Sequence, residues 1–337
     1  MKKILLSITL LASCTLPQSS FAWGADGHQT VGAIADALLV GTKAGAQVKA
    51  LLGDATLEKM SVWADCVKGI APDKDFAYTS TGRYAECIPF ETASGIAAMA
   101  DYVKRNNDAC HPGPGEESCH KQYHYADVSL QHAHYQTGYT GTSDHDVVHA
   151  IQAAALVLQD KPQPAPFNIK DKAEALALIT HFIGDIHQPL HVASAFLDAD
   201  GKLINPDEVA HDQHNNTVGG NALQCPCGNF HALWDDVPVQ FKHGRMNTML
   251  TKKARTLKLV SAPIDALPVL WADDAISDAT RVFGGAQFSK STVGQYGNSW
   301  SIGLPLEYEK TMLSVKEDAL ARAGAHLAQL LQAIWPE

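Results

Sequence analysis

The apolar residues of this chain recur mainly at the spacing of one helix face. Between Gln29 and Leu52 this spacing predicts one amphipathic helix, which Gly53 and Asp54 would end. Pro189, which lacks a backbone N–H, would end a later helix. The other helices predicted in this way are Glu58–Lys68, Asp146–Gln159, Lys172–Gln188, Thr248–Leu259, Ala262–Val282 and Tyr308–Ile334. The pattern is that of an all-α protein.

Two long stretches, Ala71–Gly95 and Asp198–Asn229, do not have helical spacing, and the second is rich in Gly, Asn, Pro and Asp. Loops of this length in a compact domain are usually functional or held by cross-links. Strand signals are confined to Tyr123–Val128 and Leu203–Ile204. Because 46% of the residues are hydrophobic and no linker is recognisable, we expect a single mainly helical domain with long loops and at most a short hairpin.

The first 22 residues have the features of a signal peptide. Lys2 and Lys3 form a basic start, Ile4–Ala12 is a short apolar run, and Ser20–Ala22 is a small-residue cleavage signal. Cleavage there would make Trp23 the first residue of the mature protein. The apolar run is shorter than the roughly 20 residues that span a bilayer. We therefore expect an exported protein, secreted or periplasmic.

The region 23–337 is expected to form one domain and to be a monomer. It contains no further apolar stretch that is long enough and free enough of charge to span a membrane. An alternative concerns the leader, because Leu11–Cys14 also resembles the cleavage box of a bacterial lipoprotein. That reading would leave an acylated Cys14 at the N-terminus.

The charge of the chain limits how it could bind nucleic acid. The formal net charge is −10 and becomes −12 when Lys2 and Lys3 leave with the leader. A protein that reads long duplexes normally has a broad basic surface, which this composition does not favour. Any nucleic acid would have to be held locally, by metal ions and by stacking.

Six of the seven cysteines lie in the mature region. An even number in an exported chain favours disulfides. Sequence neighbourhood suggests the pairs Cys66 with Cys87, Cys110 with Cys119 and, although residues two apart make a tight bridge, Cys225 with Cys227. The alternative is a structural zinc site, for which the cysteines lack the usual paired CxxC spacing.

The segment from His181 to His191 is the strongest candidate for chemistry. His181 and Asp185 are four residues apart, so on a helix both side chains point to one side. An imidazole and a carboxylate in this arrangement can hold one metal ion at about 2.0–2.2 Å. His191, just beyond Pro189, could turn toward a neighbouring ion. The alternative for an isolated pair is a local hydrogen bond.

A second pair, His231 and Asp235, has the same spacing on a predicted short helix. It follows Gly219, Gly220 and Asn221, where the backbone is permissive. A surface helix turn would explain one such pair. Two pairs in a chain with 16 histidines favour a metal site.

Weaker candidates are spread along the chain. Asp65 lies near the centre of a predicted helix and His124 in the predicted strand Tyr123–Val128, and each alone is more typical of structure than of catalysis. At the mature N-terminus, the α-amino group of Trp23 would titrate near about 7.7–8.0, so a dication could hold it neutral as a ligand. His28 is close enough in sequence to join it.

Together these motifs, WGxxGH at Trp23, WAD, HFIGDxxQPLH, GGN and LHxxWD, resemble the single-strand-specific zinc nucleases typified by the fungal S1 and P1 nucleases. The resemblance runs from Trp23 to the helix that contains Glu309, and the family shares a helical fold with the zinc phospholipases C. It implies an endonuclease that cleaves RNA and single-stranded DNA to 5′-phosphate products and acts on 3′-nucleotides. The preference between RNA and DNA, and any cleavage of duplex DNA, stay open.

The resemblance also implies three Zn²⁺ ions held by buried imidazoles and carboxylates. The three sets are the amino nitrogen and carbonyl oxygen of Trp23 with His28 and Asp185; Asp65, His124 and His181 with Asp185 as a bridge; and His191, His231 and Asp235. Zinc lowers the pKa of bound water to about 7, which supplies a nucleophile near neutral pH.

Further roles follow from the same resemblance. Asp127 would orient the attacking water, beside the catalytic carboxylates Asp65 and Asp185. Lys68 stands where the fungal relatives have an arginine, and a lysine supplies charge without the bidentate fork. Tyr125 would stack on a base, which suits an enzyme that tolerates every base; the alternative is a core aromatic. The substrate would also contact Gly219, Gly220 and Asn221.

Other histidines have no assigned ligand role. His132, His134, His145 and His149 lack support from the family motifs, and His187 would at most orient a ligand from behind.

Two rival functions are considered. A zinc phospholipase C would use nearly the same metal cage, but those enzymes have HxxxE where this chain has Asp235. A non-catalytic zinc-binding protein would need sites closed to water.

Overall fold

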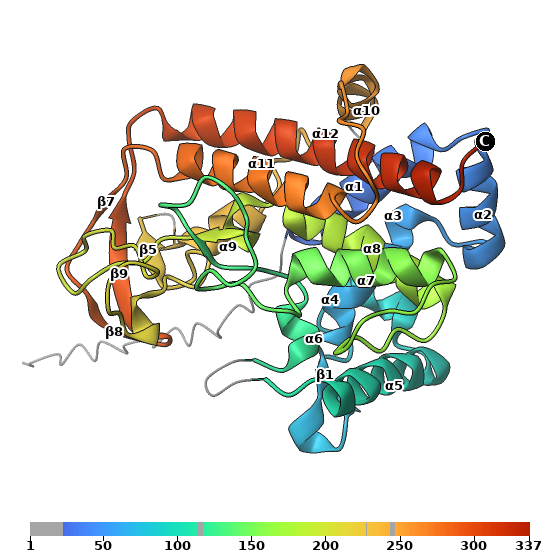
Figure 1. Cartoon of the computed structure of the whole chain (residues 1–337), viewed down its shortest axis with the longest axis horizontal. Helices are drawn as coiled ribbons and strands as arrows, with labels where there is room; N and C mark the ends of the chain where they lie inside the picture. The colour runs from blue at the N-terminus through green and yellow to red at the C-terminus, as the bar shows by residue number, and fades with distance from the viewer. Residues whose placement is uncertain (1–22, 113–116, 227, 243–246) are drawn as a thin grey trace, which may run out of the picture.

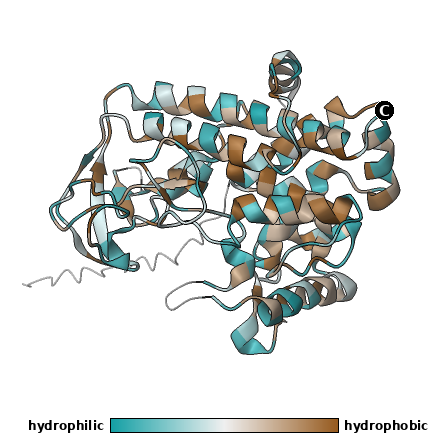
Figure 2. Ribbon diagram, in the orientation of Figure 1, coloured by the Kyte–Doolittle hydropathy of each residue, from teal (hydrophilic) through white to brown (hydrophobic). Residues whose placement is uncertain are grey.

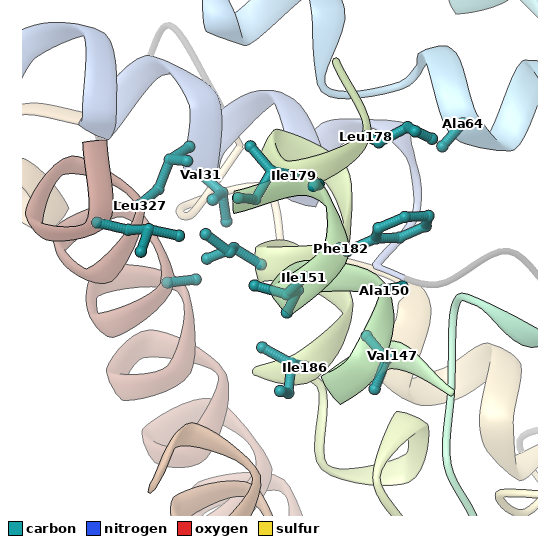
Figure 3. Packing of buried hydrophobic residues seen from close by; sticks show 14 of the residues in the cluster. Val31, Ala64, Val147, Ala150, Ile151, Leu178, Ile179, Phe182, Ile186 and Leu327 are labelled. Atoms are coloured by element: carbon teal, nitrogen blue, oxygen red, sulfur yellow. The ribbon is translucent and has the colours of Figure 1, made fainter. Parts of the chain in front are cut away.

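Helix α8 (Lys172–Ile186) runs through the middle of the molecule and is buried at every residue from Ala175 to Ile186. The side chain of Asp171 caps its N-terminus by accepting from Glu174 N–H. Helices α1, α7 and α12 pack around it. Figure 3 shows Ile179 and Phe182 of α8 among buried side chains of these neighbours, such as Val31 and Ile151. The core therefore forms around the helix that carries two candidate ligands.

The computed structural model describes residues 23–112, 117–226, 228–242 and 247–337 (Figure 1). The signal peptide and Cys14 lie outside these residues. The α-helices are α1 Ala25–Leu38, α2 Lys43–Leu52, α3 Leu57–Met60, α4 Trp63–Val67, α5 Ala93–Ala109, α6 Cys119–Gln122, α7 Val147–Leu158, α8 Lys172–Ile186, α9 Phe230–Asp235, α10 Asn247–Thr256, α11 Leu267–Val282 and α12 Tyr308–Ile334. Short 3₁₀ helices are η1 Pro72–Lys74, η2 Ala85–Phe90, η3 Pro189–His191 and η4 Gln213–Asn215.

The mainly helical fold predicted from the sequence is confirmed. The predicted Tyr308–Ile334 helix is α12 itself, and the predicted Asp146–Gln159 helix is longer than α7 by one residue at each end. In Figure 2 hydrophobic and hydrophilic residues alternate along α11 and α12, as expected for helices with one buried face. None of the helices in the described ranges is long and apolar enough to cross a membrane.

The predicted helix Gln29–Leu52 is wrong as a single element. The structure divides it into α1 and α2 at a turn where Gly41 has a φ of 78°. The hydroxyl of Thr42 then accepts from Gly45 N–H and starts α2 as its cap. The apolar spacing continues through the turn, so it did not reveal that one helix ends there and that Thr42 caps the next. The predicted helix Glu58–Lys68 is divided in a similar way into α3 and α4.

Helix α5 was not predicted at all. It is Ala-rich and polar, and the residues that it buries are few: Met99, Tyr102, Val103 and Asn106. Its first residues fall within the stretch Ala71–Gly95 that was predicted to be non-helical. Its narrow apolar face explains why hydrophobic spacing did not reveal it.

A five-stranded sheet lies at the end of the molecule away from α2 and is larger than the short hairpin expected (Figure 1). Its order is β6-β5-β9-β7, and β8 also pairs with β9. The strands are β5 Leu223–Cys225, β6 Gly228–Asn229, β7 Gln287–Phe288, β8 Thr292–Gly294 and β9 Gly297–Gly303. Most are two or three residues long, which is too short for an alternating pattern to stand out.

The predicted strand Tyr123–Val128 is mostly wrong. His124 lies in the turn after α6, and the strand β3 covers only Val128–Ser129, parallel to β4 (Ala193–Ser194). The remaining strands β1 (Ile70–Ala71) and β2 (Ala77–Tyr78) form an antiparallel pair. The predicted strand Leu203–Ile204 amounts to a bridge between Leu203 and Leu197.

Two of the expected disulfides are present, Cys66–Cys87 and Cys110–Cys119. They exclude a structural zinc site made from these four cysteines. Their presence fits an oxidising compartment. Cys227 lies outside the described residues, so its pairing with Cys225 stays a prediction.

Candidate metal centre and substrate cleft

Asp185 is the point where three histidines from distant parts of the chain meet. One of its carboxylate oxygens, Oδ2, lies 2.9 Å from His124 Nδ1 and 3.2 Å from His181 Nε2. The other, Oδ1, lies 3.4 Å from His28 Nε2. The side chains of Asp185, His28 and His181 are fully buried. Helical spacing brings His181 to Asp185, whereas His28 and His124 reach it through tertiary packing.

Asp65 extends this cluster on the side of α4. Its Oδ1 lies 3.5 Å from His181 Nε2 and 3.9 Å from His124 Nδ1. Two groups result, each with ligand atoms within 4.8 Å of one another and each able to hold a metal ion. The first group consists of His28, His181 and Asp185. The second consists of Asp65, His124 and His181, so the two groups share His181.

A third group lies next to the first two. Helix α9 presents His231 and Asp235 one turn apart, with 3.4 Å between Nε2 and Oδ2. His191 at the end of η3 completes the group, with its Nε2 3.2 Å from His231 Nε2. His191 Nδ1 is also 3.7 Å from Asp185 Oδ1. The three groups therefore form one continuous buried cluster.

Backbone carbonyls orient three of the imidazoles through the ring nitrogen Nδ1, on the side of the ring away from the cluster. In each case Nδ1 donates to a carbonyl oxygen, which leaves the Nε2 lone pair directed at the cluster. The donor and acceptor pairs are His181 to Ser61 at 2.5 Å, His191 to His124 at 2.9 Å and His231 to Gly219 at 2.7 Å. These bonds fix the tautomer that a metal ion requires.

The burial of these groups is hard to explain without cations. Both ring nitrogens of His28 and Asp185 Oδ1 lack a hydrogen-bond partner within the described residues. Burial, together with neighbouring His181, lowers the pKa of His28 and so favours its neutral, metal-binding form. Burial alone would also lower the pKa of His181, but Asp185 and Asp65 outweigh it and raise the value. A metal ion could take the place of that proton, so the residues present fit metal binding.

The residue after Trp23 contacts the third group of candidate ligands. The Trp23 side chain is fully buried, and Gly24 N–H donates to the carbonyl oxygen of Asp235 at 2.8 Å. Helix α1 then starts at Ala25 and carries His28 to Asp185. Ligation by the amino nitrogen of Trp23 depends on cleavage after residue 22 and stays a prediction.

A cleft of about 910 Å³ lies over the cluster. Its lining includes the candidate ligands Asp65, His191 and His231. Tyr125 also lines it and is only half-buried, so the alternative of a core aromatic in a strand is wrong. The volume lies within the usual range for ligand sites.

The candidate residues around the ligands differ in their surroundings. Lys68 Nζ lies 2.7 Å from Asp65 Oδ1, so its charge is partly neutralised before any phosphate arrives. Asp127 is buried, which raises its pKa to about 6, and Asn216 Nδ2 donates to its Oδ2 at 2.8 Å. Both Lys68 and Asp127 line the cleft. A cation and a carboxylate are thus available beside the candidate metal ligands.

The GGN segment contributes mainly through its backbone. Gly219 and Gly220 have φ angles of 54° and 87°, which favour glycine. Gly219 and Asn221 line the cleft, whereas Gly220 packs against Phe230 below it. The carbonyl of Gly219 accepts from His231 Nδ1. This segment therefore helps to position a candidate ligand in addition to any contact with substrate.

Sequence reasoning missed two polar residues that support the site. Asn216 holds Asp127, and Gln188 Nε2 donates to Asp235 Oδ1 at 2.9 Å. Gln188 lies inside the HFIGDxxQPLH motif, so its position was a usable signal. Asn216 lies in the long loop Asp198–Asn229, where no local pattern indicated its partner.

The histidines without an assigned ligand role form hydrogen bonds with residues that are not candidate metal ligands. His187 Nε2 meets His326 Nδ1 at 2.7 Å and its Nδ1 donates to Ile183 O, so it orients none of the candidate ligands through these contacts. The other pairings are His132 with Asp207, His134 with Asp273, His145 with Gln122 and His149 with Asp146.

The fold and the site together define a mainly helical protein with a buried His/Asp centre under a large cleft. The family model described as S1/P1 nuclease matches residues 23–336, and the chain belongs to this family. It is therefore a nuclease, a hydrolase that acts on phosphodiester bonds. The resemblance inferred from the sequence motifs is confirmed.

Two curated relatives match along nearly their whole length. Nuclease S1 of Aspergillus oryzae (strain ATCC 42149 / RIB 40) is 26% identical over 336 residues, which cover 96% of this chain and 95% of that protein. Endonuclease 5 of Arabidopsis thaliana is 22% identical over 349 residues, with coverage of 97% and 95%.

Proposed function

We propose that this protein is a zinc-dependent endonuclease that hydrolyses RNA and single-stranded DNA to 5′-phosphate products and also dephosphorylates 3′-nucleotides. The observation that carries the proposal is the meeting of three histidines at buried Asp185 beneath the cleft. A metal centre next to the space that receives the phosphodiester would suit a nuclease, because metal ions can polarise phosphate oxygens and activate water.

We assign three zinc ions to the three groups of buried ligands. By the family resemblance, Trp23, His28 and Asp185 would hold the first, Asp65, His124 and His181 together with Asp185 the second, and His191, His231 and Asp235 the third. Apart from Trp23, all of these residues belong to the groups whose ligand atoms lie close enough to hold a metal ion. Imidazole nitrogens and carboxylate oxygens in such sets favour zinc over magnesium. When bound, zinc would polarise phosphate oxygens and activate water.

Asp127 is the proposed general base. Its carboxylate lines the cleft and is oriented by the hydrogen bond from Asn216, and it would accept a proton from the attacking water. The water oxygen bonds to phosphorus, a water proton passes to Asp127 and the bond from phosphorus to the 3′ oxygen breaks, after which the departing 3′ oxyanion takes up a proton from solvent. The upstream fragment therefore ends in a 3′ hydroxyl, and the phosphate stays on the 5′ oxygen of the downstream fragment.

Lys68 and Tyr125 are proposed to hold the substrate. The Lys68 ammonium would attract the phosphate, although its ion pair with Asp65 limits the charge that it offers. Tyr125, half-buried in the cleft lining, would stack on a base of either sugar type. Asn221 and Gly219 would contact the substrate from the facing loop.

We further propose that the protein is exported as a monomer after removal of residues 1–22. The two disulfides and the start of the family match at residue 23 support this reading. Cleavage there would also give Trp23 the free amino group that the first metal set needs.

The test uses the protein starting at Trp23, with metal content measured by mass spectrometry and hydrolysis assayed on RNA, single-stranded DNA and phosphatidylcholine. Asp185→Asn should lose both metal and activity, whereas the exposed Asp54→Asn should keep both. A variant with one extra residue before Trp23 should also lose activity. Hydrolysis of phosphatidylcholine without nucleic acids would favour a phospholipase, and zinc binding without any hydrolysis would favour a non-catalytic protein.

A further inference from the structure

A second aromatic surface lines the same cleft and comes from the end of the molecule that carries the five-stranded sheet, whereas Tyr125 follows α6 (Figure 1). Tyr296 is in the turn between β8 and β9, and His214 is in η4. Both line the cleft that contains His191 and His231. Tyr296 is 37% exposed and the His214 side chain 47% exposed, so part of each ring faces solvent. We call these two residues the distal wall.

The distal wall is held in place by hydrogen bonds between its two segments. His214 Nδ1 donates to Tyr296 O at 3.2 Å, and Asn298 Nδ2 donates to His214 O at 3.1 Å. The carboxylate of Asp212 accepts from His214 N–H at 2.8 Å. These bonds hold the two backbone segments and the His214 ring in place before a ligand arrives, which reduces the conformational entropy lost on binding.

Gly297 is part of this arrangement. It has a φ of 91°, and a β-carbon at this position would lie 2.2 Å from His214 Nδ1. The imidazole therefore lies directly against the glycine backbone. No other residue would allow the turn and the ring to approach so closely.

The chemistry of the cleft indicates what this wall would bind. Aromatic faces stack on any nucleobase, at about 1–3 kcal/mol per base. Gln213 and Gln295 line the cleft next to the rings and could hydrogen-bond to base edges. Lys68 and Lys121 line the same cleft and supply cations for phosphates in a chain whose net charge is −10, although each also pairs with a carboxylate, that of Asp65 or of Glu117. Rings that stack on bases and cations that attract phosphates, brought together in one cleft, suit a single strand.

We infer that the distal wall of Tyr296 and His214 is a stacking subsite for a base of single-stranded nucleic acid beyond the nucleotide at the scissile phosphate. The inference rests on the proposed function. It predicts that affinity for substrate grows with strand length until the wall is occupied.

The test measures KM and kcat for oligothymidylates of increasing length with the zinc-loaded protein. For the longer strands, Tyr296→Ala should raise KM about tenfold with little change in kcat, as expected for the loss of one stacked base. Tyr296→Phe keeps the ring and should behave like the wild type. Gly297→Ala should resemble Tyr296→Ala, because it would displace the His214 ring.

The matched control is Val293→Ala on the same hairpin, because this residue is 96% exposed and does not line the cleft. It should keep the length dependence of the wild type. If Tyr296→Ala also keeps the wild-type dependence of KM on strand length, or raises KM equally at every length, the proposal of a stacking subsite is wrong and the nuclease proposal stands. If the wild type cleaves no oligothymidylate of any length, the proposed function itself fails.

Discussion

The backbone of Gly184 on α8 lies directly against the imidazole of His28 on α1. A β-carbon at position 184 would be 2.6 Å from His28 Nδ1 and 3.0 Å from Cε1. Gly184 immediately precedes Asp185, so the closeness of the two helices and the position of one candidate ligand depend on the same residue. Any larger side chain must move His28 away from the carboxylate.

We therefore expect Gly184→Ala to lower metal content by about one ion and to reduce nuclease activity about 10- to 100-fold, as is usual when a ligand is misplaced. Metal analysis and hydrolysis of single-stranded DNA measure both. Gly303→Ala is the control, because the nearest atom to its β-carbon would be 3.7 Å away. Full metal content in Gly184→Ala would contradict the role of this contact.

Asp127 and Asn216 provide a test of the proton acceptor. Asp127→Asn should lower kcat by about 10²- to 10⁴-fold while the metal content stays the same, because a general base is lost and the proposed ligands remain. Asn216→Ala removes only the hydrogen bond to Asp127 and should have a smaller effect. Loss of zinc in Asp127→Asn would instead mean that the carboxylate is itself a ligand.

Lys316 is expected to stabilise the end of α9. It is 1% exposed, and its ammonium donates to Leu233 O at 2.8 Å and to Asp236 O at 2.5 Å. Lys316→Met should lower the free energy of unfolding by about 1–3 kcal/mol, because both carbonyls would lose their donor. Urea denaturation measures this, with the exposed Lys310→Met on the same helix as control. Equal stability of the two variants would show that the buried contacts contribute little.

His149 should make stability depend on pH. Burial alone would lower its pKa, but the Asp146 carboxylate, 2.9 Å from Nδ1, outweighs burial and raises it. Since the folded pKa is raised, this pair stabilises the protein below the unfolded pKa of His, and the contribution disappears as pH rises through the folded pKa. The free energy of unfolding of the wild type should exceed that of His149→Gln by more at about pH 5.5 than at about pH 9.

His134→Gln is the control for this measurement, since His134 is 78% exposed where it pairs with Asp273. Exposed pairs contribute little to stability, so its effect should be small at both pH values. An equal effect of His149→Gln at the two pH values would contradict the assigned shift.

Removal of metal should destabilise the fold as well as stop hydrolysis. The carboxylates of Asp65 and Asp185 lie in one buried cluster, and an ion that binds only the native state stabilises it by mass action. Chelation should therefore lower Tm, zinc should restore it, and magnesium, which prefers oxygen ligands, should not. An unchanged Tm after complete metal loss would mean that the cluster is stable without ions.

The sequence by itself determined the local parts of this protein. A spacing of four residues on a helix places His181 beside Asp185 and His231 beside Asp235 whatever surrounds them, because helix geometry fixes it. The strong apolar period likewise located α12. Where the decisive feature was a cap, as at Thr42, or a narrow apolar face, as in α5, the same pattern failed.

Tertiary structure decided which of these local pairs meet. His28 reaches Asp185 because Gly184 lets α1 approach α8, and His124 reaches it from a turn that the sequence indicated as a strand. The bond from Asn216 to Asp127 joins residues 89 apart in the chain. Such contacts depend on how whole elements pack, and packing leaves no periodic trace in the sequence from which it could be predicted.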